Sequence, residues 1–67
     1  MTFEEFKKDI FENIETLPAS WRKGQKVFNY IDAKYHIARK TQFNYGVDCF
    51  YNNNLIDKFI EQSYKLI

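Results

Sequence analysis

Apolar residues recur three and four positions apart along three separate stretches of the chain, and this spacing is the feature that most restricts the possible folds. Residues three and four apart lie on one face of an α-helix, so each stretch predicts a helix with one buried face. The first stretch predicts a helix over roughly residues 3–16, and Thr2 and Glu5 form the T-x-x-E pattern of a capping box at its start. Its recurring apolar positions are Phe3, Phe6, Ile10, Ile14 and Leu17.

A second helix is expected over roughly residues 21–35, after a break at Pro18. Pro18 cannot continue the first helix and Ser20 is a favourable N-cap for the next one, although a start with Pro18 in the first turn also fits the sequence. The predicted buried face consists of Trp21, Gly24, Phe28, Ile31 and Tyr35, with Val27 beside them. Glycine inside a helix costs about 1 kcal/mol relative to alanine, so we expect Gly24 to permit the close approach of another helix or an aromatic ring. The alternative is a helix that begins after Gly24.

The second half of the chain contains one ambiguous stretch and one strongly periodic stretch. Residues 36–43, HIARKTQF, fit a short helix, which we prefer, or a short extended segment that ends at Phe43. Residues 44–52 are expected to form a loop in which Gly46 permits a positive φ. An asparagine among residues 52–54 is expected to cap the last helix. The apolar positions of that helix are Leu55, Ile56, Phe59, Ile60, Tyr64 and Ile67.

No stretch alternates polar and apolar residues as a strand does, so the sequence predicts an all-α fold. We expect a single helical domain over residues 1–67, a compact bundle of three main helices plus one short helix. A chain of this length buries only about 60% of its unfolded surface and has little room for an enclosed pocket. No cofactor is therefore expected, and binding on an outer surface or association with a second copy is the natural mode.

Cys49 is the only cysteine, which excludes an intrachain disulfide and a zinc site of several thiolates. A reducing compartment fits this composition best. The stretch MTFEEFKKDIF is acidic and amphipathic rather than basic and apolar like a signal peptide, and no apolar stretch reaches the length of a membrane span. The sequence therefore predicts a cytoplasmic protein without a membrane partner.

Charge is distributed unevenly along the chain, although the formal net charge is only +1. Residues 1–20 carry five acids and two lysines, whereas residues 21–45 carry six basic residues and one acid, Asp32. The basic residues are Arg22, Lys23, Lys26, Lys34, Arg39 and Lys40. Positive charge in the first turn of a helix opposes the helix dipole, and broken local rules are often found at functional surfaces. We therefore treat these six as candidate partner-binding residues.

Three interpretations of the basic residues stay open at the level of the sequence. They form an ordinary solvated face that pairs with the acids of the first helix, a docking face for an acidic protein, or a face that binds nucleic acid. Gln25, Asn29 and the arginines suit contacts to bases and phosphates, but the near-neutral net charge and the acidic first helix oppose nucleic-acid binding. We prefer a small non-enzymatic interaction module that binds an acidic protein partner, with a small DNA- or RNA-binding domain as the alternative.

The chain offers little for catalysis. His36 and Cys49 are the only residues that suggest a thiol nucleophile with its base, and they are single residues without a recognised spacing. We expect Cys49 to be buried and His36 to be exposed. A metal site of His36 with Asp48 is equally weak, and the sequence has no glycine-rich phosphate loop. The five tyrosines are expected to be core residues with their hydroxyls at the rim, although tyrosine also stacks on bases.

Two segments, WRKGQKVFNYI and VDCFYNNNLIDKFI, resemble a set of short, uncharacterised phage and bacterial proteins. The shared pattern reads R-x-G-Q-x-x-F-N, then D-x-F-Y, then I-x-x-F-I/L, and it covers residues 21–60 without the first helix. The matching positions are Arg22, Gly24, Gln25, Phe28, Asn29, Asp48, Phe50, Tyr51, Ile56, Phe59 and Ile60. Many of these proteins have proline where this chain has Cys49, which argues against a catalytic thiol. The resemblance implies phage or mobile-element biology and supplies no mechanism.

Gln25 and Asn29 lie four positions apart at the edge of the predicted buried face, and buried amides need hydrogen-bond partners. The loop VDCFY offers backbone groups and the carboxylate of Asp48. We therefore expect Gln25, Asn29 and Asp48, with Arg22 as a further candidate, to form a clamp that holds this loop on the second helix. Such a structural role competes with a binding role for the same residues.

Overall fold

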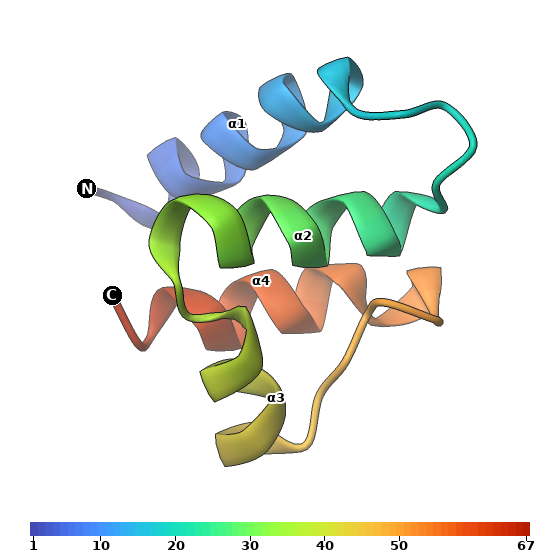
Figure 1. The fold of residues 1–67 in the computed structure, drawn as a ribbon. Coiled ribbons are helices and arrows are strands. Elements are labelled where there is room, and N and C mark those ends of the chain that lie inside the picture. Colours follow the sequence, from blue (N-terminus) through green and yellow to red (C-terminus); the bar gives the residue numbers. More distant parts are fainter.

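The computed structural model describes all 67 residues and contains helices but no strand. Its elements are α1 (Phe3–Asn13), which continues into a 3₁₀ turn, η1 (Ile14–Thr16), then α2 (Lys23–Tyr35), α3 (Ala38–Tyr45), a second 3₁₀ turn, η2 (Asn53–Leu55), and α4 (Ile56–Tyr64). Figure 1 shows α2 and α4 running along each other, α1 on the other side of α2 in this view and tilted relative to it, and the short α3 below. The predicted all-α bundle of three main helices plus one short helix is confirmed. None of these helices has the length and apolar character needed to cross a bilayer.

The core forms where the apolar faces of α1, α2 and α4 meet, and most of it was visible as helical spacing in the sequence. Its fully buried members are Phe6, Ile10, Val27, Ile31, Ala38, Cys49, Phe59 and Ile60. The predicted capping box at the start of α1 is confirmed, because Thr2 Oγ1 accepts from the Glu5 amide at 3.1 Å and Glu5 Oε1 accepts from the Thr2 amide at 2.7 Å.

The start of α2 differs from the prediction. Ser20 is not its N-cap, because residues 18–21 form a turn closed by a hydrogen bond from the Trp21 amide to the Pro18 carbonyl oxygen. The helix therefore begins at Lys23, and its N-cap, Arg22, provides no side-chain acceptor. Instead Oδ1 of Asn53 accepts from the Gly24 amide at 2.8 Å, so the amino end of α2 is capped from η2.

Gly24 is buried and permits a close approach, as expected, but its neighbour is neither a helix nor an aromatic ring. A Cβ atom built on Gly24 would lie 1.9 Å from the carbonyl oxygen of Cys49. The segment that needs the glycine is therefore the backbone of the loop after α3. The alternative of a helix that begins after Gly24 is wrong, because Gly24 lies inside α2.

The ambiguous stretch is helical, and the extended alternative is wrong. The helix α3 is fixed to the body by its buried residues Ala38 and Thr41, and the hydroxyls of Thr41 and Ser63 lie 2.8 Å apart. It ends at Gly46, which has the expected positive φ of 64°. Asn52 accepts from the Asn54 amide and caps η2, so the predicted asparagine cap serves the turn before α4 rather than α4 itself.

Candidate functional site

The six predicted basic residues fall into two groups, those that form an ion pair within the fold and those that do not. Lys34 lies 2.9 Å from both carboxylate oxygens of Asp9, and Arg39 Nε lies 3.8 Å from Oδ2 of Asp32. These two cations have partners within the fold. The other four, Arg22, Lys23, Lys26 and Lys40, form no ion pair.

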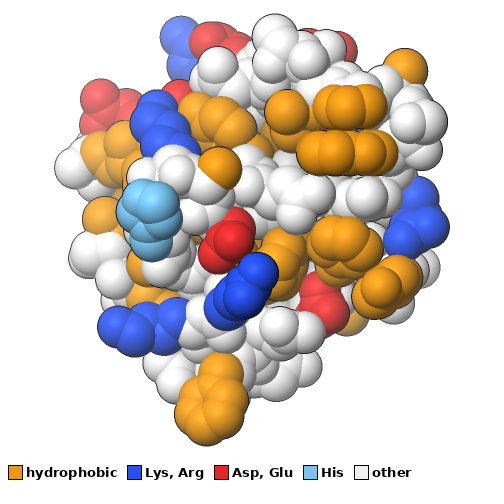
Figure 2. All heavy atoms as spheres, viewed as in Figure 1, with side chains coloured by type: hydrophobic (Ala, Val, Ile, Leu, Met, Phe, Trp, Pro, Cys, Tyr) orange, Lys and Arg blue, Asp and Glu red, His pale blue; other side chains and the backbone are white.

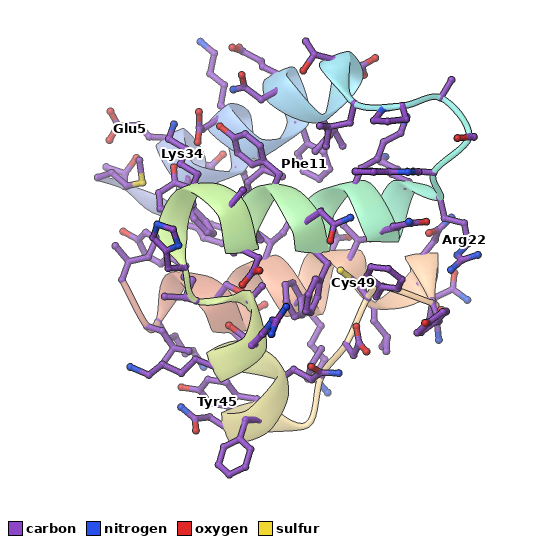
Figure 3. The ribbon with its side chains drawn as sticks, in the orientation of Figure 1. Glu5, Phe11, Arg22, Lys34, Tyr45 and Cys49 are labelled. Atoms are coloured by element: carbon purple, nitrogen blue, oxygen red, sulfur yellow. The ribbon has the colours of Figure 1, made fainter.

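The basic residues do not form one continuous surface. Arg22 and Lys34 lie at opposite ends of α2, about 18 Å apart at 1.5 Å per residue (Figure 3). On the face in Figure 2, basic side chains are separated by apolar and uncharged ones. Arg39 and Lys40 belong to α3 rather than to α2. Three cations without an ion-pair partner lie together at the start of α2, and we call them the amino-terminal cluster: Arg22, Lys23 and Lys26.

The amino-terminal cluster stands where a helix favours negative charge. No acidic residue occurs in the first turn of α2, and Arg22 occupies the N-cap position without a capping hydrogen bond. The aligned peptide dipoles place about half a positive elementary charge at this end of the helix. The cluster therefore concentrates unpaired positive charge on a terminus that is already positive.

An exposed aromatic residue adjoins the cluster. The guanidinium carbon of Arg22 lies 5.2 Å from the ring centroid of Tyr51, which is 77% exposed. The Tyr51 ring contacts Phe50, Phe50 contacts Phe28, and successive centroids are 4.8 and 5.6 Å apart. Phe28 in turn packs on the buried ring of Phe59. A ladder of rings therefore connects the core to an arginine–tyrosine pair on the surface.

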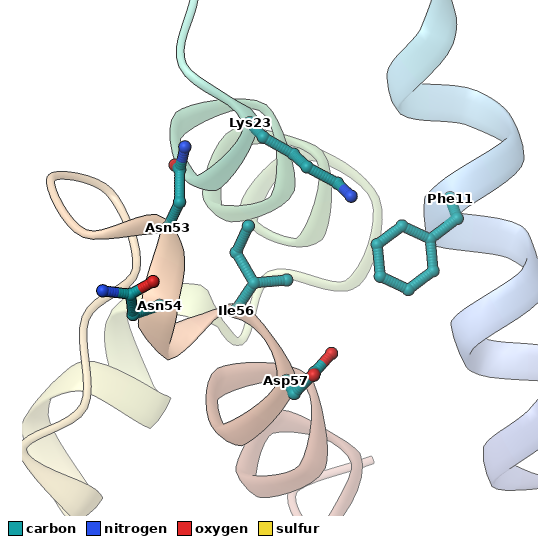
Figure 4. Close-up of a pocket in the computed structure, with 6 residues that line it drawn as sticks. All are labelled: Phe11, Lys23, Asn53, Asn54, Ile56 and Asp57. Carbon is teal, nitrogen blue, oxygen red and sulfur yellow. The ribbon is translucent and has the colours of Figure 1, made fainter.

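Two separate hollows share Lys23 as a lining residue. The larger hollow has a volume of about 410 Å³ (Figure 4). It is lined by Phe11, Lys23, Asn53, Asn54, Ile56 and Asp57. The smaller hollow measures about 300 Å³ and is lined by Ile14, Glu15, Lys23 and Lys26. The Lys23 ammonium group lies 5.2 Å from the centroid of the Phe11 ring.

The predicted clamp is wrong for Gln25 and Asn29, whose half-buried side chains form no hydrogen bond. The loop after α3 is held by Asp48, which accepts from Gln42 Nε2 and from the Phe50 amide, each at 2.8 Å. The physical reason is Gly24. Because the missing side chain lets the loop backbone reach α2 directly, no amide side chain is needed to bridge them.

The expectation for the tyrosines holds for three of the five. Tyr30, Tyr35 and Tyr64 are half-buried, and their hydroxyls donate hydrogen bonds. Tyr45 and Tyr51 are exposed, so the prediction of core positions is wrong for both. Their exposure could not be read from spacing, because it follows from the protrusion of α3 and from the path of the loop after it.

A polar cluster between α1 and α2 was not expected from the sequence. Asp9 accepts hydrogen bonds from the hydroxyls of Tyr35 and Tyr30, at 2.5 and 3.0 Å, in addition to its contacts with Lys34. Burial alone would raise the pKa of Asp9, but the hydrogen bonds from Tyr35, Lys34 and Tyr30 outweigh it and lower the pKa. Burial and the bond to Asp9 raise the pKa of Tyr35 to about 12. The one signal in the sequence is the spacing of Tyr30, Lys34 and Tyr35 on neighbouring turns.

Cys49 is buried and His36 is exposed, as expected. The Cys49 thiol donates to the carbonyl oxygen of Gly24 at an Sγ–O distance of 3.3 Å. Burial, with a smaller contribution from the Asp48 carboxylate, raises the pKa of the thiol to about 12, so the thiol is protonated at neutral pH. His36 terminates α2 with a φ of 59°, and no three His, Cys, Asp or Glu side chains group as metal ligands do.

No protein-family model, curated protein or solved structure matches this chain. The resemblance to short phage and bacterial proteins therefore stays a prediction, and the candidate site depends on the geometry alone.

Proposed function

We propose that the protein is a small interaction module that binds an acidic protein segment through the amino-terminal cluster. The observation that carries the proposal is the absence of any ion-pair partner for Arg22, Lys23 and Lys26 around the positive end of α2. Cations at this position cost about 0.3–1 kcal/mol each at low ionic strength, so they oppose the stability of the isolated fold. Carboxylates of a partner supply the missing negative charge.

The residues beside the cluster support a protein partner. Arginine, tyrosine and other aromatic residues are enriched in the energetically dominant positions of protein interfaces. Arg22 and the exposed Tyr51 form such a pair, and Phe50 and Phe28 fix it to the core. Because the pair is already assembled, binding requires little ordering of side chains.

Nucleic acid is the second candidate, and the Arg22–Tyr51 pair is the observation that favours it, since bases stack on such side chains. One feature favours the protein partner instead. The amino-terminal cluster offers only three cations, which is few for a surface that follows a phosphate backbone. Following the resemblance and the single reduced cysteine, we place this binding, without catalysis, in the cytoplasm and in phage or mobile-element biology.

The proposal is tested by fluorescence anisotropy with labelled polyglutamate and with short single-stranded and duplex DNA and RNA. The double substitution Arg22→Glu with Lys26→Glu should abolish polyglutamate binding without loss of helical circular dichroism. The matched control is Lys58→Glu with Lys65→Glu, which makes the same charge change on exposed, unpaired residues of the α4 segment and should retain binding. Equal loss in both variants would show that net charge, rather than the cluster, attracts the probe.

Salt separates the two candidate functions. Release of counterions from three phosphates gives a log–log slope of about −2.7, or a loss of about one and a half decades in affinity between 50 and 200 mM salt. Tight binding of DNA or RNA with this slope, and weak binding of polyglutamate, would favour the nucleic-acid alternative. Preference for polyglutamate at both salt concentrations supports the protein partner.

A further inference from the structure

We propose that α2 binds the acidic segment as an extended chain, with two side-chain amides hydrogen-bonded to its main chain and two cations paired with carboxylates at alternate positions. The amides are those of Gln25 and Asn29, and the cations are Arg22 and Lys26. This inference rests on the proposed function and specifies the conformation and the charge spacing of the segment that the amino-terminal cluster binds. Its basis is that neither amide has a partner within the fold.

The two amides are free to bind. Gln25 and Asn29 are half-buried, and neither side chain forms a hydrogen bond. The one polar side-chain atom that is buried without a partner is Oε1 of Gln62, so the amide groups of Gln25 and Asn29 stay accessible from outside. A side-chain amide has one acceptor oxygen and two N–H donors. Each amide therefore suits both the N–H and the C=O groups of a peptide.

The amides and the cations form two adjacent rows on α2. Residues three and four apart are neighbours on the surface of a helix. Gln25 and Asn29 therefore form one row, the amide row, and Arg22 and Lys26 form a second, the basic row. At 1.5 Å per residue, the two members of each row are about 6 Å apart along the helix axis. Neither cation has an ion-pair partner.

An extended chain matches this spacing. Its residues rise about 3.2–3.4 Å each and its side chains alternate between two faces, so one face repeats after about 6.4–6.8 Å. Carboxylates at alternate positions therefore reach both cations, whereas adjacent carboxylates point to opposite faces. The N–H and C=O groups along one edge also repeat every second residue and meet the amide row. A helical segment lacks free groups of this kind, because its main chain is bonded internally.

The acids near the two rows leave room for a carboxylate. Glu15 lies on the other side of the basic row, in the hollow lined by Lys23 and Lys26. Asp32, one turn beyond the amide row, is ion-paired with Arg39. The surface between the rows therefore carries unpaired positive charge and free amides. Polyglutamate has carboxylates at alternate positions in every register, so it satisfies this arrangement.

Capped heptapeptides test the spacing when they are titrated into ¹⁵N-labelled protein at low salt. The alternate peptide is acetyl-Ala-Ala-Glu-Ala-Glu-Ala-Ala-amide, and the adjacent peptide, of the same composition, is acetyl-Ala-Ala-Glu-Glu-Ala-Ala-Ala-amide. The alternate peptide should bind about two- to fivefold more tightly, which is the effect of one additional exposed ion pair. It should also shift the side-chain NH₂ signals of Gln25 and Asn29 together with the backbone amides of residues 22–26.

Two N-methylated forms of the alternate peptide test the main-chain contacts. One form carries N-methyl groups on both glutamates, and the other carries them on the alanine after each glutamate. Successive N–H groups of an extended chain point to opposite edges, so only one form loses the N–H groups that face the amide row. That form should bind about tenfold more weakly than the other, as expected for the loss of two hydrogen bonds.

A double variant tests which residues make these contacts. Gln25→Met with Asn29→Leu removes both amides and keeps side chains of similar size. It should bind the two methylated forms equally, and it should bind the unmodified alternate peptide about tenfold more weakly than wild type does. The matched control, Asn44→Leu with Gln62→Met, makes the same replacements in α3 and α4 and should behave as wild type. Dispersed amide spectra of both variants verify that they fold.

The outcomes separate this inference from the proposed function. Equal binding of the alternate and adjacent peptides, or of the two methylated forms, with shifts confined to the backbone of residues 22–26, would overturn the extended chain and leave the acidic partner in place. Side-chain shifts of Gln25 and Asn29 with single-stranded DNA, but not with the peptides, would overturn it in favour of nucleic acid. The absence of shifts at residues 22–26 with every peptide would contradict both proposals.

Discussion

At the scale of single residues, Gly24 and Asp9 each hold two segments of the chain together, and they do so by opposite means. Gly24 acts through the side chain that it lacks, which lets the backbone at Cys49 lie against α2. Asp9 acts through its carboxylate, which gathers Tyr30, Lys34 and Tyr35 of α2 onto α1. The special role of Gly24 could be predicted, because glycine is unfavourable inside a helix. The role of Asp9 could not, because its partners lie more than 20 positions away along the chain.

Substitution of Gly24 by alanine should destabilise the protein. The added methyl group would overlap the Cys49 carbonyl oxygen, so the loop after α3 must move, at a cost of about 1–3 kcal/mol for overpacking. Urea denaturation measures the change. The control is Gly46→Asn, which meets open space and keeps a residue that tolerates a positive φ, and it should cost much less. Equal stability of Gly24→Ala and wild type would refute the close approach.

Asp9 should make the free energy of unfolding depend on pH in the acidic range. Its pKa is lowered by folding from an ordinary value of 3.8, so its contribution is complete above that pH and is lost as the pH falls through the lower folded-state pKa. At neutral pH, Asp9→Asn should lower the free energy of unfolding by about 1–3 kcal/mol, because the substitution removes the charge of a carboxylate that accepts several hydrogen bonds. Thermal unfolding of wild type and Asp9→Asn should be measured from neutral to strongly acidic pH. The two curves of Tm against pH should converge in acid. A constant difference between them would contradict this role.

At the scale of elements, the sequence predicted features that depend on residues close together in the chain, such as helical spacing and local caps. It did not predict contacts between distant segments. The cap of α1 consists of Thr2 and Glu5, three positions apart, so the sequence alone indicates it. The cap of α2 comes from Asn53, 29 positions away, and no local pattern reveals it. The same limit explains the incorrect clamp. Gln25 and Asn29 had suitable side chains, but the path of the loop decided which groups met.

Asn53→Ala should weaken the amino end of α2. Loss of the bond to the Gly24 amide should cost about 0.5–2 kcal/mol, as for other helix caps, and should accelerate amide hydrogen exchange at residues 23–25. The neighbouring Asn54→Ala removes a side chain without a hydrogen bond and is the matched control. Asn29→Ala should leave exchange in residues 47–51 unchanged. Faster exchange there would contradict the structure and support the predicted clamp.

At the scale of the whole molecule, the architecture followed from helical spacing and short length, whereas the proposed binding surface depended on which basic residues form ion pairs within the fold. Six basic residues were candidates, and the fold pairs Lys34 with Asp9 and Arg39 with Asp32. Pairing across elements cannot be read from spacing within one helix. The fold thus reduced a broad basic face to the amino-terminal cluster, which the protein retains although it opposes the α2 dipole.

The central claim is that this cluster serves a partner at a cost to the fold, and the thermal midpoint of Arg22→Asp tests it most directly. Aspartate at the N-cap can accept a hydrogen bond from the backbone N–H of Gln25, and its negative charge interacts favourably with the helix dipole. Together these effects should raise the free energy of unfolding by about 0.5–2 kcal/mol. The lost contact with Tyr51 costs about 0.5–1 kcal/mol, and Arg22→Ala is the reference that loses the same contact and the same positive charge without gaining a carboxylate. Each net kcal/mol raises Tm by about 4–8 °C in a domain of this size. We predict that Tm of Arg22→Asp exceeds those of Arg22→Ala and wild type, whereas a Tm below wild type would show that Arg22 is retained for the fold and would contradict the account.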